Sequence, residues 1–284
     1  MFSTKIKGTI RLFRPDLSLA AGVCVLAGQV LAAGHLPSLR IGLLGFICIF
    51  AVSGTALILN DYFDYEVDKI NAPERPLPSG AVSRSEALWL TALTALVGLV
   101  AALWLGLPVL LLSILLLAIG ILYNWRLKEA GLPGNLMVSA SVALSFILGA
   151  VTLGDPWNKV VWTFSLMAFL LDLGEEIAGD AMDMEGDKKR NSRSLALVRG
   201  KPFALRVSLV LWGVMILLSL LPALMGWLGL IYLVIILLTD GLFIFFSVRL
   251  LRSQTPAAGH AAMRGIYLGA TLAVVAFLVG QLIP

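Results

Sequence analysis

The chain has 284 residues, of which 59% are hydrophobic and only 13% are charged, with a formal net charge of +4 at pH 7. A soluble globular protein carries about a quarter charged residues, so this composition excludes a water-soluble domain. We therefore expect most of the protein surface to face lipid, as the mean hydropathy of +0.95 also indicates.

The N-terminal segment 1–16 is basic and amphipathic, and we expect it to lie on the membrane surface as a helix. Apolar segments follow, each close to the roughly 20 residues that an α-helix needs to cross a bilayer. We expect transmembrane helices at 17–33, 41–62, 84–106, 109–125, 134–153, 160–180, 204–224, 228–249 and 263–282. Continuous apolar runs exclude the alternating pattern of a membrane β-barrel. We predict an all-α, polytopic bundle of about nine transmembrane helices, with residues 1–284 forming a single integral-membrane domain.

The basic residues are distributed unevenly between the two sides of this predicted bundle. Of the 21 lysines and arginines, only Arg40 and Lys159 fall in loops after odd-numbered spans. All the others lie in the N-terminal segment or in loops after even-numbered spans. Because cytoplasmic loops carry the excess of basic residues, we expect a multi-pass cell-membrane protein whose N-terminus and working face are cytoplasmic.

Acidic residues gather where the second predicted span ends. In the run from Asn60 to Asp68, the residues Asn60, Asp64 and Asp68 are spaced i, i+4 and i+8. On a helix this spacing places their side chains on one face, about 6 Å apart along the axis. Asp61 points about 100° away from Asn60, so a structural role and a ligand role are both open for it.

A second acidic stripe ends the sixth predicted span and consists of Asp172, Glu176, Asp180, Asp183 and Asp187. Both stripes end even-numbered spans, so both lie on the same side of the membrane. Carboxylates at membrane depth are costly and usually functional. Hard oxygen ligands on two helices suit Mg²⁺, which bridges substrate phosphates. The alternative, that these are only the solvated ends of two helices, explains one stripe better than two.

These motifs resemble those of the UbiA superfamily of intramembrane prenyltransferases. The run Asn60–Asp68 fits its N-D-x-x-D-x-x-x-D motif, and the pair Asp183 and Asp187 fits its D-x-x-x-D motif. The segments 75–80 (RPLPSG) and 123–128 (YNWRLK) are similar to two of its loops. The residues around Asp183 most resemble the branch that includes digeranylgeranylglyceryl phosphate synthases and chlorophyll synthases.

The resemblance implies Mg²⁺-dependent transfer of a geranylgeranyl-type group from its diphosphate to a lipophilic acceptor with a hydroxyl or carboxyl group. It implies metal ligands among Asn60, Asp61, Asp64, Asp68, Asp183 and Asp187. Catalytic roles in binding the diphosphate or deprotonating the acceptor fall to Arg75, Tyr123, Arg126, Lys128, Glu176, Asp180 and Lys188. The expected partners are an isoprenoid diphosphate, a lipophilic acceptor and membrane lipid, with no nucleic acid, and the oligomeric state stays open.

Three other functions remain open on the sequence. An aromatic, quinone-precursor prenyltransferase and a terpene cyclase of the same superfamily would ionise the same diphosphate. A cation-coupled transporter would need carboxylates near mid-bilayer and broken helices in both halves, whereas here the stripes lie on one side. Asp240, inside the eighth span, is either functional or hydrogen-bonded to a neighbouring helix.

Overall fold

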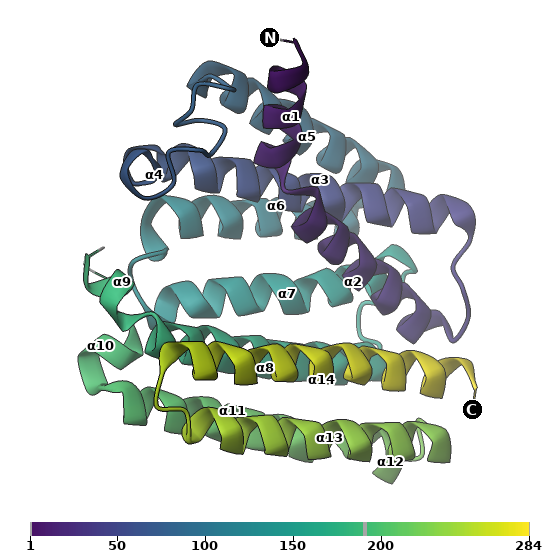
Figure 1. The fold of residues 1–284 in the computed structure, drawn as a ribbon. Coiled ribbons are helices and arrows are strands. Elements are labelled where there is room, and N and C mark those ends of the chain that lie inside the picture. Colours follow the sequence, from purple (N-terminus) through teal and green to yellow (C-terminus); the bar gives the residue numbers. More distant parts are fainter. Residues whose placement is uncertain (1, 190–191, 284) are drawn as a thin grey trace.

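The computed structural model describes residues 2–189 and 192–283, and within these residues it contains helices and no strands (Figure 1). The short α1 (Phe2–Phe13) leads into the bundle. The long helices are α2 (Pro15–Ala33), α3 (Leu39–Phe63), α5 (Arg84–Leu105), α6 (Leu107–Leu122), α7 (Leu132–Thr152), α8 (Lys159–Met182), α11 (Lys201–Ser219), α13 (Leu230–Leu251) and α14 (Pro256–Leu282). The short elements are α4 (Tyr65–Asn71), the π-helical turn η1 (Tyr123–Leu127), α9 (Met184–Lys189), α10 (Leu195–Arg199) and α12 (Leu221–Leu224).

Eight helices in the described part of the chain are long and apolar enough to cross a membrane. They are the long helices other than α8, whose carboxylates make it less apolar. The 24-residue α8 is as long as its neighbours and packs against α7 and α11 inside the bundle. The predicted all-α, polytopic membrane bundle is therefore confirmed, and α8 brings the number of long helices in the described residues to nine.

Several helices begin where the sequence supplies an N-cap. The hydroxyl of Ser38 accepts a hydrogen bond from the backbone N–H of Ile41 at the start of α3. Ser83 and Glu86 form a capping box at the start of α5. These side chains satisfy backbone donors that the first turn of a helix leaves without partners, which explains why the spans start at these residues.

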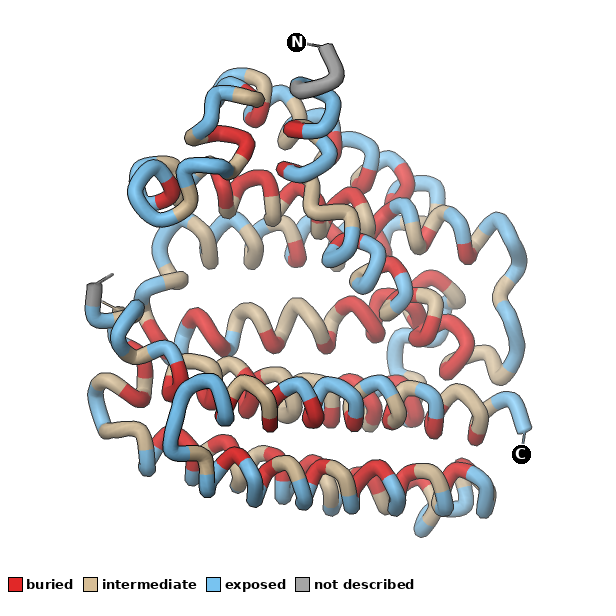
Figure 2. Tube along the Cα trace, in the orientation of Figure 1, coloured by how far each residue is buried: buried red, intermediate tan, exposed pale blue. Residues whose placement is uncertain are grey.

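The interior consists of two main apolar clusters, and α2 and α7 contribute to both. One cluster joins these helices to α8, α11, α13 and α14, and the other joins them to α3, α5 and α6. Figure 2 shows buried positions facing inward along the helices, while exposed positions face outward. The α2–α7 pair therefore forms the seam between the two halves of the bundle.

Small residues allow α2 and α7 to approach closely at this seam. A Cβ added at Gly28 of α2 would overlap the backbone of Phe146, and one added at Gly149 of α7 would overlap the backbone of α2 near Val25. Close contact between helix backbones at small residues is a common way to stabilise helix pairs in lipid.

We expect a Gly149→Val substitution to lower the free energy of unfolding by about 1–3 kcal/mol, because the added atoms force the two helices apart. Denaturant unfolding in detergent micelles measures this. Gly213→Ala is the matched control, since a Cβ there meets no atom within 4 Å. Equal stability of the Gly149 variant and the wild type would contradict a tightly packed seam.

Both acidic motifs lie at the same end of the bundle. Figure 1 shows α4, α9 and α10 at one end, and α12 with the C-terminus at the other. Since α4 contains the end of the first motif and α9 contains part of the second, the fold brings the two stripes to one face, as the alternation of spans predicts.

Candidate active site

Each acidic motif crosses a joint between two helices, and an aspartate forms each joint. Asp64 links α3 to α4, and Asp183 links α8 to α9. The backbone N–H of Asp68 donates to Asp64 O at 2.8 Å, and that of Asp187 donates to Asp183 O at 3.0 Å. The i→i+4 backbone hydrogen bonds therefore continue across both joints, although Asp64 (φ −78°, ψ 0°) and Asp183 (φ −103°, ψ 17°) depart from ideal helical angles.

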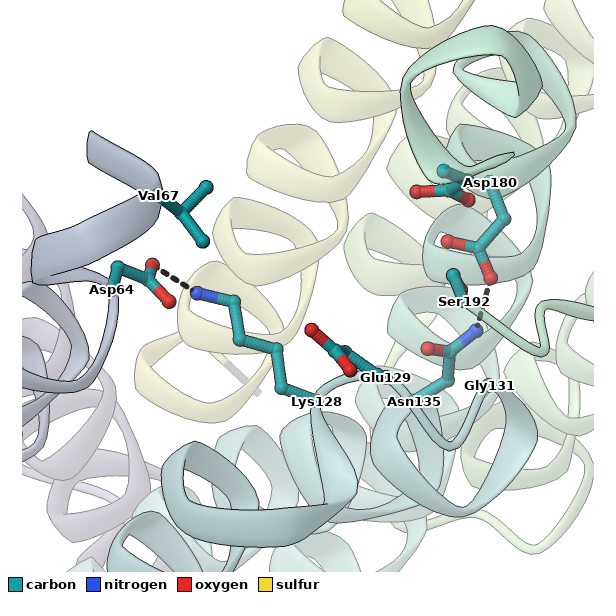
Figure 3. A pocket seen from close by; sticks show the side chains of 9 residues that line it. Asp64, Val67, Lys128, Glu129, Gly131, Asn135, Asp180 and Ser192 are labelled. Carbon is teal, nitrogen blue, oxygen red and sulfur yellow. Dashed lines mark hydrogen bonds and ion pairs between the residues drawn. The ribbon is translucent and has the colours of Figure 1, made fainter. Parts of the chain in front are cut away.

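Carboxylates from both motifs line one pocket, which we call the acidic pocket (Figure 3). Its lining residues are Asp64, Val67, Lys128, Glu129, Gly131, Asn135, Asp180, Asp187 and Ser192. The ammonium of Lys128 reaches across to the carboxylate of Asp64. On the opposite side, Nδ2 of Asn135 donates to Oδ2 of Asp180 at 2.9 Å. The tips of α3 and α8 therefore meet around a space that carries both negative and positive charge.

The loop between α6 and α7 positions Lys128. The π-helical turn η1 ends α6, and the backbone N–H of Lys128 donates to Tyr123 O at 2.9 Å. The loop is also tied to the segment before α10, because the N–H of Arg193 donates to Glu129 O at 3.0 Å. Gly131 permits this approach, since its φ of +73° suits glycine and a Cβ would overlap the backbone of Arg193.

Two arginines hold the buried carboxylates of the first motif. Nη2 of Arg14 contacts Oδ1 of Asp61 at 2.5 Å, and Nη1 of Arg75 contacts Oδ2 of Asp68 at 2.7 Å and Oδ1 of Asp61 at 3.8 Å. Burial lowers the pKa of Arg75, but the hydrogen bond that Arg75 donates to Asp68 and the nearby negative charges outweigh this effect. The pKa of Arg75 therefore lies above its ordinary value. Arg75 therefore stays charged, and the four residues form one charge-neutral cluster that is not part of the lining of the acidic pocket.

Three further predicted residues lie close to this arrangement. Nδ2 of Asn60 donates to Oδ1 of Asn124 at 3.0 Å, which orients the amide of Asn60. The ring of Tyr123 lies beside Gly134 at the start of α7. Glu176 lines a second polar cavity between α8 and α14, which we call the α8–α14 cavity.

Other predicted residues point elsewhere. Arg126 is exposed and its guanidinium stacks over the ring of Trp125 at 5.4 Å. Lys188 is exposed, and neither cation lines the acidic pocket. Asp183 lines the α8–α14 cavity, where its carboxylate contacts Nε2 of His260 at 3.1 Å. The structure therefore separates these three from the residues that line the acidic pocket.

The structure adds residues that the motif pattern does not single out. Asn135 and Glu129 line the acidic pocket, and His260 of α14 reaches the second motif. Asn135 carries a weak sequence signal, as a polar amide in the first turn of an apolar helix. Glu175, beside the predicted Glu176, is also buried at the site. His260 is 77 residues from its partner, so no local pattern reveals it.

The donor set of the acidic pocket fits Mg²⁺. Asp64, Asp180 and Asp187 offer hard carboxylate oxygens, which this ion prefers. In the described part of the chain, no three His, Cys, Asp or Glu side chains form a ready-made metal cluster. Mg²⁺ commonly binds through one or two carboxylates together with waters and substrate phosphates, so a complete protein cage is not required.

Comparisons with known proteins agree with this geometry. The chain matches the UbiA prenyltransferase family over residues 21–279. It is 34% identical to the digeranylgeranylglyceryl phosphate synthase of Thermococcus kodakarensis, with 98% of this chain and 99% of the relative covered. A solved structure of a digeranylgeranylglyceryl phosphate synthase superposes with a TM-score of 0.86 at 29% identity, covering 98% of this chain and 99% of the other.

A more distant structure shows the same fold. A UbiA homologue from Archaeoglobus fulgidus, bound to GPP and Mg²⁺, superposes with a TM-score of 0.70 at 19% identity. The superposition covers 95% of this chain and 99% of the homologue. At this level of identity the likeness concerns the arrangement of the helices.

Proposed function

The chain belongs to the UbiA prenyltransferase family, and we propose that it transfers a geranylgeranyl-type group from its diphosphate to the hydroxyl group of a lipophilic glycerol phosphate. One observation carries the proposal: Asp64 from one motif and Asp180 and Asp187 from the other line a single pocket that also contains Lys128. This donor set suits a diphosphate with a divalent cation. The likeness to digeranylgeranylglyceryl phosphate synthases supports the choice of acceptor.

We assign Mg²⁺ to the two motifs. Asn60 and Asp64 would hold one ion and Asp183 and Asp187 another, while Asp68 stays paired with Arg75. Bound Mg²⁺ would neutralise the charge that develops on the leaving diphosphate. Asp61 is paired with Arg14, so in this proposal it helps to hold the first motif in place and is not itself a metal ligand.

The chain's own cations bind and orient the diphosphate in this proposal. Lys128 lines the acidic pocket, and Arg75, which is outside this lining, contacts Asp68. Preorganised positive groups stabilise a leaving anion without reorganising, which is usually the largest catalytic contribution. Arg126 and Lys188 are exposed, so we assign them to the approach of the substrate rather than to its bound state.

The helices supply the apolar surroundings that the chemistry needs. A cavity of about 560 Å³ between α2, α7, α8 and α14 is lined mainly by apolar side chains, including Phe146, Phe164 and Met167. An isoprenoid chain in such a cavity excludes water that would otherwise capture the allylic cation. The basic loops at this end of the bundle support a cytoplasmic orientation of the acidic pocket.

In the decisive experiment, purified protein is incubated with labelled geranylgeranyl diphosphate and one acceptor per reaction. The acceptors are geranylgeranylglyceryl phosphate, a chlorophyllide and a quinone precursor. We expect an ether product with the glycerol phosphate. Adding EDTA should abolish turnover and added Mg²⁺ should restore it, because the diphosphate then regains its counter-ions. A prenylated aromatic product, or a cyclised hydrocarbon without acceptor, would contradict the proposed acceptor and favour the corresponding alternative.

A further inference from the structure

Glu175 of α8 is a buried carboxylate that the two motifs leave without a role. Its side chain is only 6% exposed, and its Oε1 receives no hydrogen bond from the residues that the structure describes. Two carboxylates near it on α8 each have a donor: Asp172 accepts from Ser139 at 2.8 Å and Asp180 accepts from Asn135 at 2.9 Å. A buried carboxylate oxygen without a donor is costly and needs an explanation, such as a ligand that completes it.

Glu175 lies where two cavities adjoin. One is the apolar cavity between α2, α7, α8 and α14, and the other is the α8–α14 cavity; Glu175 and Tyr267 line both. The α8–α14 cavity in turn shares Asp180 and Asp187 with the acidic pocket. A continuous lining therefore connects the acidic pocket, through the α8–α14 cavity, to Glu175 and the apolar cavity.

This position matches the demands of a lipid that carries a hydroxyl group. The apolar cavity accommodates its hydrocarbon chain, and the α8–α14 cavity contains Arg264 and His260, which suit a phosphate. The hydroxyl between these two parts then lies beside Glu175. Along α8, Glu175 is five residues from Asp180, or about 7.5 Å along the axis, so the hydroxyl lies within a short distance of the acidic pocket.

We propose that Glu175 is the general base that accepts the proton of the acceptor's hydroxyl; this rests on the proposed transfer to a hydroxyl acceptor. The bond between C1 of the prenyl group and the diphosphate oxygen breaks, and the diphosphate leaves with the electron pair. The acceptor oxygen forms its bond to C1 and transfers its proton to a carboxylate oxygen of Glu175. The proton then leaves to water through the α8–α14 cavity.

Other carboxylates fit this role less well. Asp180 lines the acidic pocket and already accepts the hydrogen bond from Asn135. Glu176 lines the α8–α14 cavity but not the apolar one. Asp172 lines the apolar cavity only and is held by Ser139. Glu175 alone among these four reaches both cavities and keeps an oxygen without a donor.

The test is Glu175→Gln, which keeps the shape of the side chain and removes the base. We expect prenyl transfer to geranylgeranylglyceryl phosphate to fall by about 10²–10⁴-fold, the usual contribution of a general base. Release of diphosphate from geranylgeranyl diphosphate without acceptor, a reaction with water, should be unchanged and should still need Mg²⁺. Glu175→Asp keeps a carboxylate and should retain more transfer than Glu175→Gln.

The control is Asp240→Asn, which removes another buried carboxylate, on α13, whose Oδ2 accepts from Ser219 at 2.7 Å outside these cavities. This variant should transfer the prenyl group like the wild type. The assignment would be overturned if Glu175→Gln transferred the prenyl group as fast as the wild type. It would also be overturned if Glu175→Gln and Glu175→Asp lost the same share of transfer activity, or if Glu175→Gln lost diphosphate release to the same extent as transfer. The wild-type assay with the hydroxyl acceptor tests the proposed function separately. Failure of the proposed function can therefore be distinguished from failure of the assignment of Glu175 as the base.

Discussion

Replacing Asp64 with asparagine is expected to lower kcat for prenyl transfer by about 10²–10³-fold, the range seen when one preorganised electrostatic group is removed from an active site. Asp64 is the carboxylate of the first motif that lines the acidic pocket, since Asp61 and Asp68 are engaged by arginines. The substitution removes the negative charge that pairs with Lys128 and would hold Mg²⁺. Steady-state assays at saturating diphosphate over a series of Mg²⁺ concentrations measure the effect.

The folded structure should tolerate this change. Asp64 lies at a joint between two helices and its side chain is partly exposed, so asparagine can keep a polar contact there. Glu66→Gln is the matched control, because Glu66 is exposed and, among the residues that the structure describes, its ion pair is with the nearby Lys69 on α4. Thermal unfolding should be unchanged in both variants. Full activity of Asp64→Asn would refute the metal assignment.

Replacing Arg14 with methionine is expected to lower the free energy of unfolding by about 3 kcal/mol, the lower end of the cost of removing one partner from a buried ion pair. Asp61 is only 3% exposed, and of its ion pairs in the described part of the chain it would keep the more distant one with Arg75, at 3.8 Å. Arg14 also has a φ of +45°, an unusual value for a residue with a side chain, so the ion pair holds the bend between α1 and α2.

Two further variants distinguish the contribution of the Arg14–Asp61 ion pair to stability from the contribution of the packing of α1. Lys5→Met removes a cation that pairs with Glu86 at an exposed site, and it should cost less than about 1 kcal/mol. Arg14→Met combined with Asp61→Asn should recover part of the lost stability, because no buried charge is left without a partner. Denaturant titrations in detergent of the wild type, these variants and Asp61→Asn alone give the free energies that the comparison needs. Additive losses in the double variant would show that the two residues act independently.

The architecture follows from local sequence. Bilayer thickness requires about 20 apolar residues in each span, and each span is one uninterrupted run in the chain. The predicted segment 41–62 corresponds to α3 (Leu39–Phe63), and the segment 134–153 to α7 (Leu132–Thr152). The i, i+4 spacing of the acidic motifs and their place at even-numbered span ends likewise predict one functional face, and the family resemblance is confirmed by the match over residues 21–279.

The partners of each carboxylate depend on contacts between distant segments. Asp61 is 47 residues from Arg14, and Asp64 is 64 residues from Lys128, so spacing along one helix cannot show that these pairs form. The π-helical turn η1 also changes the register after α6. Lys128 consequently lines the pocket, while Arg126 stacks on Trp125 outside it.

The sequence by itself therefore determined the helical membrane fold and the placing of both acidic motifs at one end of the bundle, because hydropathy and helical periodicity are local properties. Only the tertiary structure decided which carboxylates face the acidic pocket, which are neutralised by arginines, and that Glu175 is buried where two cavities adjoin. These features arise from the packing of α8 against α7 and α14, which brings together residues far apart in the chain.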